Sequence, residues 1–365
     1  MNPFWNTGAI ENPDYFYNRK AEVDKLLSFV ANRISCSVYG NRKIGKSSLA
    51  KYVIQLYKTQ KKMFNHPNLI WIYIDFQQII PITKSDFWKL LVKEIIKKLK
   101  EFQGVNNYFA DLGNFESLLQ ESNVKAIDFG DFLVQLNLDE KDIQLVIVMD
   151  EFEASISNHD FDLGFYGALR SFVPKLTYVT LTQNSLYTLQ YRETSTVTSP
   201  FFNIFASLTL ELFSHEGAEN LLLGISKIEG NPFSIDDINF LIALSGYHPF
   251  FLQRAAYFLY ESRFNQNHAV DITIIYDDVS NKLFQEASTH FHYYWSRLSE
   301  TQKQLISKFA EQRKVSMASL TNQEKLDMNQ LAEQSLVFSD EESEKYQLFS
   351  NAFHAYIVQK NGELK

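Results

Sequence analysis

Cysteine is almost absent from the sequence, because Cys36 is the only one among 365 residues. A single thiol cannot form an intrachain disulfide, and it cannot supply a thiolate metal cluster. The composition therefore excludes a disulfide framework and a zinc–thiolate centre. A reducing compartment fits it.

Long apolar runs are also missing, since no stretch approaches the roughly 18 residues that a membrane span needs. The first residues, MNPFWNTGAIENPDYF, lack the basic region and following apolar stretch of a secretory signal. We therefore expect a soluble, cytoplasmic protein without a membrane partner.

Positive charge is in the minority: 35 Lys and Arg stand against 43 Asp and Glu, which gives a net charge of −8. This balance argues against a chain-wide electrostatic grip on nucleic acid. The stretch from Lys89 to Lys100 is basic, but its leucines and isoleucines fall at helical spacing and its lysines on the other face. We interpret this stretch as a solvated helix face.

Hydrophobic residues are plentiful, at 45% of the sequence, and 31 Phe and 19 Tyr stand out among them. Such a composition is typical of globular proteins and not of disordered chains. The length predicts two or three compact units.

Apolar runs alternate with helical patterns up to about residue 210. Buried strands are expected at 34–39, 68–76, 143–150 and 176–182, and helices at 46–63, 84–102 and 162–173. Strand–helix–strand repeats with nearly continuous apolar strands predict an α/β fold, in which a parallel sheet has helices on both faces. The Asn- and Gly-containing segment 102–126 has broken periodicity and is expected to be an insertion or a mobile surface element.

After residue 213 the pattern is mainly helical. Three helices are expected at 214–227, 234–246 and 249–264, with Ser214 and Ser234 as N-caps, Gly246 as a stop and Pro249 in a first turn. A polar gap separates them from a further helix, and a Ser299–Gln302 capping box opens the next one.

Two short helical stretches (316–322 and 326–335) and a two-stranded hairpin complete a pattern typical of a winged helix. The predicted domains are therefore an α/β domain at 1–213, a helical lid at 214–265 and a winged helix at 280–365.

The segment from Gly40 to Ser47, GNRKIGKS, matches the phosphate-binding loop pattern G-x-x-x-x-G-K-[ST]. A tight loop after a strand turns several backbone N–H groups inward, its glycines permit the curvature, and the following helix adds its dipole. The predicted nucleotide-binding residues of this loop are Gly40, Asn41, Arg42, Lys43, Ile44, Gly45, Lys46, Ser47 and Ser48.

The chemistry of the loop assigns roles to individual side chains. Lys46 is expected to reach the β and γ phosphates, and the Ser47 hydroxyl to ligate magnesium. The apolar run LVIVMDEFE ends in Asp150 and Glu151, which we expect on a strand neighbouring that of the loop. Asp150 would hold magnesium, and Glu151 would orient and deprotonate the attacking water. We interpret Glu153 as a surface or helix-start residue.

Several segments together resemble the STAND class of P-loop ATPases, which is related to the AAA+ superfamily. They are NPF and FYNRKAEVDKLL before the loop, the loop itself, LVIVMDEFE, SPFFNIFASLTLELFS and GYHPFFLQ. The resemblance runs from residue 2 to about residue 360.

This resemblance implies residues that contact adenine. In such proteins an aromatic-Gly-Arg-x-x-Glu segment helps to enclose the base, and the matching residues here are Phe16, Tyr17, Asn18, Arg19 and Glu22. Asn18 replaces the usual glycine, and asparagine tolerates positive φ best among the other residues.

A lid proline also packs on the base in this class, which implies the same role for Pro249. We interpret His248, which precedes Pro249, as a packing residue, and His290 and His292 likewise.

Two more implied sites concern the γ-phosphate. The class often has a polar or arginine sensor at the end of the fourth strand, where this sequence has Thr182, Gln183 and Asn184, so Gln183 would be a neutral sensor. Arg170 lies where an arginine finger acting on a neighbouring subunit could be, or it forms a surface salt bridge.

The resemblance implies a switch ATPase that binds ATP or ADP with Mg²⁺, hydrolyses ATP slowly, and couples its nucleotide state to an unidentified effector or sensor protein. A nucleotide-dependent homo-oligomer is also implied.

One alternative is a DNA-handling AAA+ ATPase, a loader or transposition-type regulator. The expected recognition helix at 324–336 disfavours it, because it carries one lysine against three acidic residues, and the expected wing tip is acidic as well. The other alternative is a nucleotide-bound scaffold without hydrolysis, which Lys46, Asp150 and Glu151 disfavour.

Overall fold

The computed structural model describes residues 2–60, 68–103, 112–192, 200–264, 271–340 and 345–363. The chain divides into two compact units. We call Arg19–Tyr39 with Lys46–Leu210 the sheet unit, and Met1–Asn18 with Gly40–Gly45 and Glu211–Lys365 the helical unit. The separate lid and winged-helix domains that the sequence suggested stay a prediction.

The sheet unit contains five parallel strands in the order β2-β3-β4-β1-β5. The strands are β1 (Cys36–Tyr39), β2 (Asn68–Asp75), β3 (Ile143–Asp150), β4 (Leu176–Thr182) and β5 (Ala206–Thr209). The predicted fold class and the first four strands are confirmed. The short edge strand β5 was not predicted, because four residues with a single buried position give little periodic signal.

One expectation about this sheet is wrong. The strand that ends in Asp150 is not a neighbour of the strand before the phosphate loop, because β4 lies between β1 and β3 and pairs with both. Sequence order does not reveal such an insertion, since β4 follows both strands in the chain.

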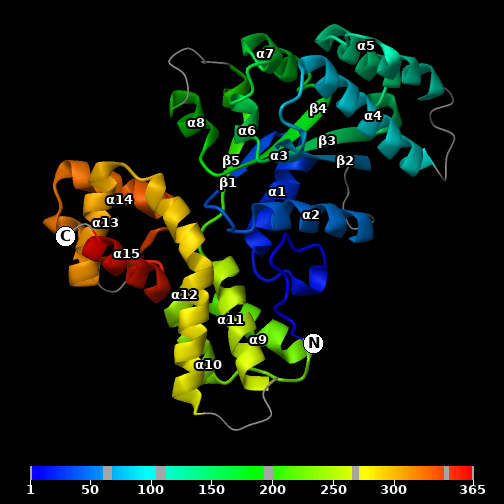
Figure 1. Ribbon diagram of the computed structural model, residues 1–365. Coiled ribbons are helices and arrows are strands. Elements are labelled where there is room, and N and C mark those ends of the chain that lie inside the picture. The colour runs from blue at the N-terminus through cyan, green and yellow to red at the C-terminus, as the bar shows by residue number, and fades with distance from the viewer. Residues whose placement is uncertain are drawn as a thin grey trace. The chain divides into compact units, whose positions relative to one another are not determined.

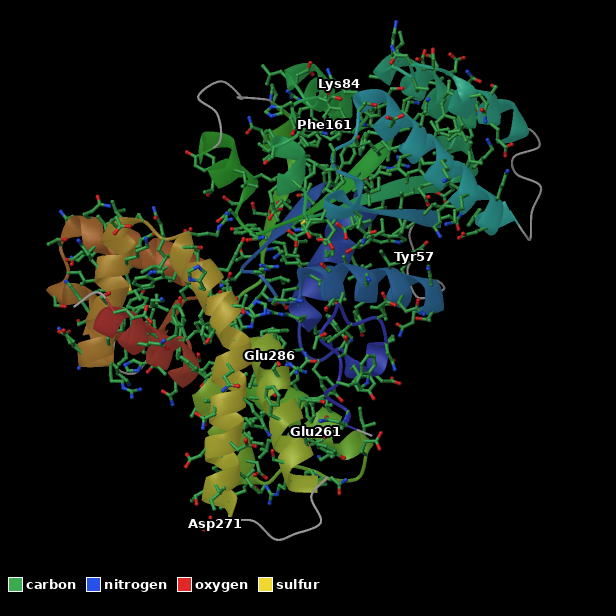
Figure 2. All side chains as sticks on the ribbon, in the orientation of Figure 1. Tyr57, Lys84, Phe161, Glu261, Asp271 and Glu286 are labelled. Atoms are coloured by element: carbon green, nitrogen blue, oxygen red, sulfur yellow. The ribbon has the colours of Figure 1, made fainter. Side chains whose placement is uncertain are left out.

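Helices cover both faces of the sheet, as Figure 1 shows for α1 and α2 on one face and α4, α5 and α7 on the other. Ile70, Ile72 and Ile74 alternate along β2 and join the core under α4 and α5. On the opposite face, Trp71 packs against Tyr57 of α2, with ring centroids 6.4 Å apart; Figure 2 labels Tyr57. Strand β2 therefore packs on both of its faces, as parallel strands in the interior of an α/β unit do.

The helical elements of the sheet unit are of two kinds. The α-helices are α1 (Lys20–Ala31), α2 (Lys46–Gln60), α3 (Phe76–Ile79), α4 (Lys84–Gln103), α5 (Ala126–Leu136), α6 (Glu153–Ile156), α7 (Leu163–Ser171) and α8 (Leu186–Arg192). The 3-10 helices are η3 (Leu112–Gln120), η4 (Asp139–Lys141) and η5 (Pro200–Ile204). Part of the expected insertion, 104–111, lies outside the described residues, and the rest forms η3 and the approach to α5.

The helical unit begins with helices that match their predicted starts and stops. Ser214 and Ser234 accept hydrogen bonds from backbone N–H groups of α9 (His215–Ile228) and α10 (Ile235–Ser245). Gly246 ends α10 with a φ of +66°, and Pro249 is the first residue of α11 (Pro249–Phe264). The longer α12 (Ile272–Ser296) follows.

The C-terminal elements differ in part from the prediction. Ser299 and Gln302 form the expected capping box at the start of α13 (Glu300–Gln312). Of the two expected short helices, the one at 326–335 corresponds to α14 (Asn322–Glu333), which begins earlier because Thr321 and Glu324 form a capping box there. The one at 316–322 is wrong, because β6 (Lys314–Ser316) and the 3-10 helix η6 (Met317–Ser319) occupy that segment.

The remaining strands and the last helix complete this region. The hairpin strands β7 (Val337–Asp340) and β8 (Lys345–Leu348) pair antiparallel, and β6 adds a third strand in the order β6-β8-β7. The tip of the predicted wing, 341–344, lies outside the described residues. A final helix, α15 (Asn351–Glu363), was not predicted, and the short 3-10 helix η1 (Pro13–Tyr15) lies near the N-terminus.

One hydrophobic core joins helices α9 to α15 within the helical unit. At its edge, the Arg254 guanidinium forms two hydrogen bonds to the Glu286 carboxylate, at 2.5 and 2.8 Å; Figure 2 labels Glu286 on α12. No helix in the described part of the chain is long and apolar enough to cross a membrane.

Candidate nucleotide-binding site

The phosphate loop has the expected local structure. Strand β1 ends at Tyr39, residues 40–45 form the loop, and α2 begins at Lys46. Gly45 has a φ of +107°, where an L side chain is strained, although no neighbouring atom would contact an added Cβ. The demand for glycine at this position is therefore conformational.

The start of α2 meets the end of β3. The Ser47 hydroxyl donates a hydrogen bond to Oδ2 of Asp150 at 2.7 Å, so the two expected magnesium ligands lie together although β4 separates their strands. Lys46 and Asp150 are both buried, at 7% and 6% exposure. A buried lysine near a carboxylate pair is suited to a strongly charged ligand.

Tyr73 on β2 is a further member of this group that the sequence did not indicate. Its hydroxyl donates a hydrogen bond to the same Asp150 oxygen that Ser47 contacts. Burial raises the pKa of Tyr73, and the Asp150 charge raises it further, so the phenol stays protonated. No motif marks Tyr73, and only the pairing of β2 with β3 places it beside Asp150.

Glu151 directly follows β3 in an unusual backbone conformation. Its φ is +50°, which a residue with a Cβ rarely adopts. The Glu151 N–H donates to Oδ1 of Asp150 at 2.9 Å, and the Glu151 carbonyl accepts from the N–H of Ala154 at 3.0 Å. These bonds hold a sharp turn directly after the strand.

Glu153 corrects one sequence interpretation. It does begin a helix, α6, but it is not a surface residue, because its carboxyl is largely buried. The N–H of Gln183, just past β4, donates to Oε1 of Glu153 at 3.1 Å. Burial raises the pKa of Glu153 to about 7, the nearby Glu151 charge raises it as well, and Lys46 lowers it.

The tip of the phosphate loop belongs to the helical unit, where its side chains have specific contacts. The Asn41 amide donates to the carbonyl of Gln334 at 2.7 Å. The Arg42 guanidinium lies 4.8 Å from the ring centre of Tyr293, and the Tyr294 hydroxyl donates to the Arg42 carbonyl at 3.2 Å. The variable positions of the motif are thus engaged by α12 and by the residue after α14.

Lys43 makes a second set of loop contacts. Its ammonium donates to the carbonyl of Thr7 at 3.3 Å and lies 5.2 Å from the ring centre of Phe250. Phe250 follows Pro249 at the start of α11.

The charges of the loop also act on His290 of α12. Burial lowers the pKa of His290, and the charges of Arg42 and Lys43 lower it further.

The residues expected near adenine fall in both units. Tyr17 packs against α9 so closely that a Cβ at Gly224 would overlap its ring. Asn18 has the left-handed conformation that the sequence allowed, with a φ of +61°, and its amide donates to the carbonyl of Gly217. Arg19 belongs to the sheet unit, where it is buried and pairs with Glu22 at 2.9 Å.

Two other interpretations concern packing and exposure. His248 is fully buried and packs in a tilted arrangement against Phe251 and Phe349, with ring centroids 4.7 and 5.9 Å away. Arg170 is exposed in the last turn of α7, so its role as an arginine finger stays a prediction.

The residues present fit a magnesium nucleotide. A serine hydroxyl and a carboxylate are hard oxygen donors, and magnesium commonly takes one or two protein ligands and completes its shell with phosphate and water. Among the described residues, no group of three or more His, Cys, Asp or Glu side chains could hold a metal alone. This donor set therefore suits a cation that arrives with phosphate.

Solved structures with the same fold include a Walker-type ATPase of Pyrococcus abyssi. It superposes with a TM-score of 0.65 at 13% identity, over 97% of this chain and 99% of that one. The Aeropyrum pernix ORC2 protein, solved as ADPNP–ADP complexes, gives a TM-score of 0.59 at 13% identity, over 100% and 98% of the two chains. At such identities, these likenesses show the fold alone. A search of curated proteins found no significant match.

A family model supplies the classification. The model described as Novel STAND NTPase 2 matches residues 21–314, which is well over half of the chain and includes the phosphate loop, Asp150, Glu151 and helices α9 to α12. The resemblance to the STAND class is thereby confirmed, and the chain belongs to the Novel STAND NTPase 2 family.

Proposed function

We propose that this protein is a switch ATPase that binds ATP with magnesium, hydrolyses it slowly and transmits its nucleotide state to a partner protein. The observation that carries this proposal is the contact between Ser47 and Asp150, because it joins the two expected magnesium ligands next to the buried Lys46. A fold held by packing alone does not need a buried lysine and carboxylate at the mouth of a glycine-bounded loop.

The chain's own residues have separable roles in this proposal. Backbone N–H groups of the loop and the Lys46 ammonium bind the phosphates, while Ser47 and Asp150 hold the cation. Magnesium, when bound, neutralises charge on the phosphate oxygens. Glu151 orients a water molecule and accepts its proton.

The switch part of the proposal rests on the loop tip. Asn41, Arg42 and Lys43 contact residues of the helical unit, including Gln334 and Tyr293. A ligand that changes the loop conformation therefore changes its contacts with α11, α12 and the residue after α14. Such coupling is what transmission to a partner protein requires.

DNA handling is the weaker proposal. Asp327 of α14 is buried, and of the other acidic residues there Glu324 pairs with Lys308, at 2.5 Å. Among the basic residues of α4, Lys98 and Lys100 pair with Glu101 and Glu116. These pairs reduce the positive charge that α4 offers to phosphate, and α14 carries more acidic than basic residues.

Nucleotide binding is tested with the variant Lys46→Ala. We expect it to abolish binding of a fluorescent ATP analogue and magnesium-dependent ATP hydrolysis, because the phosphates lose their buried cation. Lys58→Ala is the matched control, since it removes the same charge from the exposed last turn of α2. Equal analogue affinity in wild-type protein and Lys46→Ala would overturn the site.

A further inference from the structure

The turn between β3 and α6 is fastened to the end of β4 at two points. The N–H of Phe152 donates to the carbonyl of Leu181 at 3.2 Å, and the N–H of Gln183 donates to Oε1 of Glu153 at 3.1 Å. The first bond joins two backbones, and the second needs the Glu153 side chain. Glu151 lies within this turn, between Asp150 and Phe152.

Burial of the Glu153 carboxyl costs free energy of folding. Its second oxygen, Oε2, is buried and has no hydrogen-bond partner among the described residues. Buried polar atoms of this kind are uncommon in folded proteins, and each costs free energy unless it is compensated. Its electrostatic neighbours are Glu151, which repels the carboxylate, and Lys46, which attracts it. The fold thus keeps the Glu153 carboxyl buried, at a cost in free energy, between Glu151 and Gln183.

A specific geometric need explains this placement. The backbone of Glu151 is in the left-handed region, a conformation that persists only where the surroundings hold it. Besides the backbone bond from Phe152 to Leu181, the Glu153 carboxylate joins this turn to the end of β4. Without the Glu153 side chain, the Gln183 N–H loses this acceptor in the turn.

We propose that Glu153 is a positioning residue, which holds Glu151 and Gln183 at a fixed separation by accepting the Gln183 N–H. This role rests on the proposed ATP hydrolysis. Glu153 contacts neither the expected cation ligands nor the loop through any described hydrogen bond, so it acts through its two neighbours. Its loss is expected to reduce the rate of the chemical step and to leave ATP affinity nearly unchanged, because Lys46 and Ser47 are untouched.

The test compares wild-type chain with Glu153→Ala and Glu153→Gln. The first readout needs no nucleotide: hydrogen exchange of the Gln183 amide, followed by mass spectrometry, should become at least tenfold faster in Glu153→Ala. In Glu153→Gln the side-chain carbonyl still accepts, so protection should largely return. Glu140→Ala, at the opposite end of β3 and exposed, is the matched control and should leave the exchange unchanged.

The second readout is hydrolysis. We expect kcat to fall at least tenfold in Glu153→Ala, with KM for ATP within about threefold of wild type, and Glu153→Gln to recover most of kcat. If Glu153→Ala folds poorly, Glu153→Asp replaces it, because it keeps the charge but is one methylene too short to reach Gln183.

The outcomes separate the two proposals. A wild-type chain that hydrolyses ATP while Glu153→Ala keeps both its kcat and its Gln183 protection overturns the positioning role alone. Faster exchange with an unchanged kcat overturns it too, since the bond would then be structural only. A wild-type chain that binds no ATP analogue overturns the proposed function and this role together.

Discussion

Glu151 combines an acidic side chain with a backbone conformation that favours glycine, at a φ of +50°. Glutamine has the same shape but cannot accept the proton of water. We therefore expect Glu151→Gln to bind ATP and magnesium with unchanged affinity and to lose at least 100-fold in kcat. Single-turnover hydrolysis and analogue binding measure the two effects. A wild-type hydrolysis rate in this variant would remove Glu151 from the role of general base.

The buried carboxyl of Glu153 makes stability depend on pH in a predictable direction. Its pKa is about 7 in the folded chain against a reference value of 4.5, so between these values the folded state keeps a proton that the unfolded state releases. Stability then falls as pH rises from about 4.5 to about 7, and the full loss, at most about 3 kcal/mol, is present above pH 7.

We accordingly expect Glu153→Gln to raise the unfolding temperature relative to wild type at pH 8 and much less at pH 5. Scanning calorimetry of the nucleotide-free chain measures this difference at both pH values. Glu140→Gln, which is exposed, should show no such trend. An identical shift at pH 5 and pH 8 would contradict the assignment.

Among the secondary-structure elements, the end of α10 depends on a single residue. Gly246 has a φ of +66° and a ψ of −157°, a region that essentially only glycine occupies. A Cβ there would also overlap the backbone carbonyl of Phe349, which belongs to the same unit. The turn between α10 and α11 therefore needs glycine for both conformation and space.

Gly246→Ala should consequently destabilise the helical unit by more than about 3 kcal/mol, because strain and steric overlap add. Gly230→Ala is the matched control: Gly230 also has a positive φ, +76°, but an added Cβ would contact nothing, so we expect a cost of about 1 kcal/mol. Urea unfolding of the full chain compares the two variants. Equal urea midpoints for the two variants would contradict this prediction, because they would show that the Phe349 backbone moves aside without a loss of stability.

For the whole molecule, each of the two units has its own hydrophobic core, and the phosphate loop is divided between them after Gly45. The first part of the loop makes its side-chain contacts in the helical unit, and Lys46 and Ser47 lie at the start of α2 in the sheet unit. The proposed switch depends on this division. Asn41 and Arg42 contact residues of the helical unit, and Ser47 contacts Asp150 of the sheet unit.

The whole chain carries a net charge of −8, and on α4 Lys98 and Lys100 pair with acidic side chains. We expect no binding of duplex DNA in a mobility-shift titration at about 50 mM salt, where electrostatic attraction to phosphate is strong. Micromolar binding that weakens steeply with added salt would make DNA handling the leading function. Lys93 and Lys97 are both exposed on α4. If the double variant Lys93→Glu, Lys97→Glu lost that binding, the DNA-binding surface would lie on α4.

The sequence by itself determined the features that depend on neighbours in the chain. The strand–loop–helix corner at Gly40 to Ser47, the caps Ser214 and Ser234 and the stop at Gly246 follow from backbone rules that act over a few residues. Strands β1 to β4 followed from continuous apolar runs of sufficient length. These predictions succeeded because the physical cause and its signal lie in the same short segment.

Only the tertiary structure decided which of these segments meet. The insertion of β4 between β1 and β3, the Tyr73 hydroxyl beside Asp150, and the bond from Gln183 to Glu153 all join residues far apart in sequence. Glu153 read as a surface residue because an acidic side chain after a strand is usually solvated, and its burial depends on how the end of β4 packs over the turn. Strand order and side-chain burial are set by the packing of the whole sheet unit, and no local pattern encodes them.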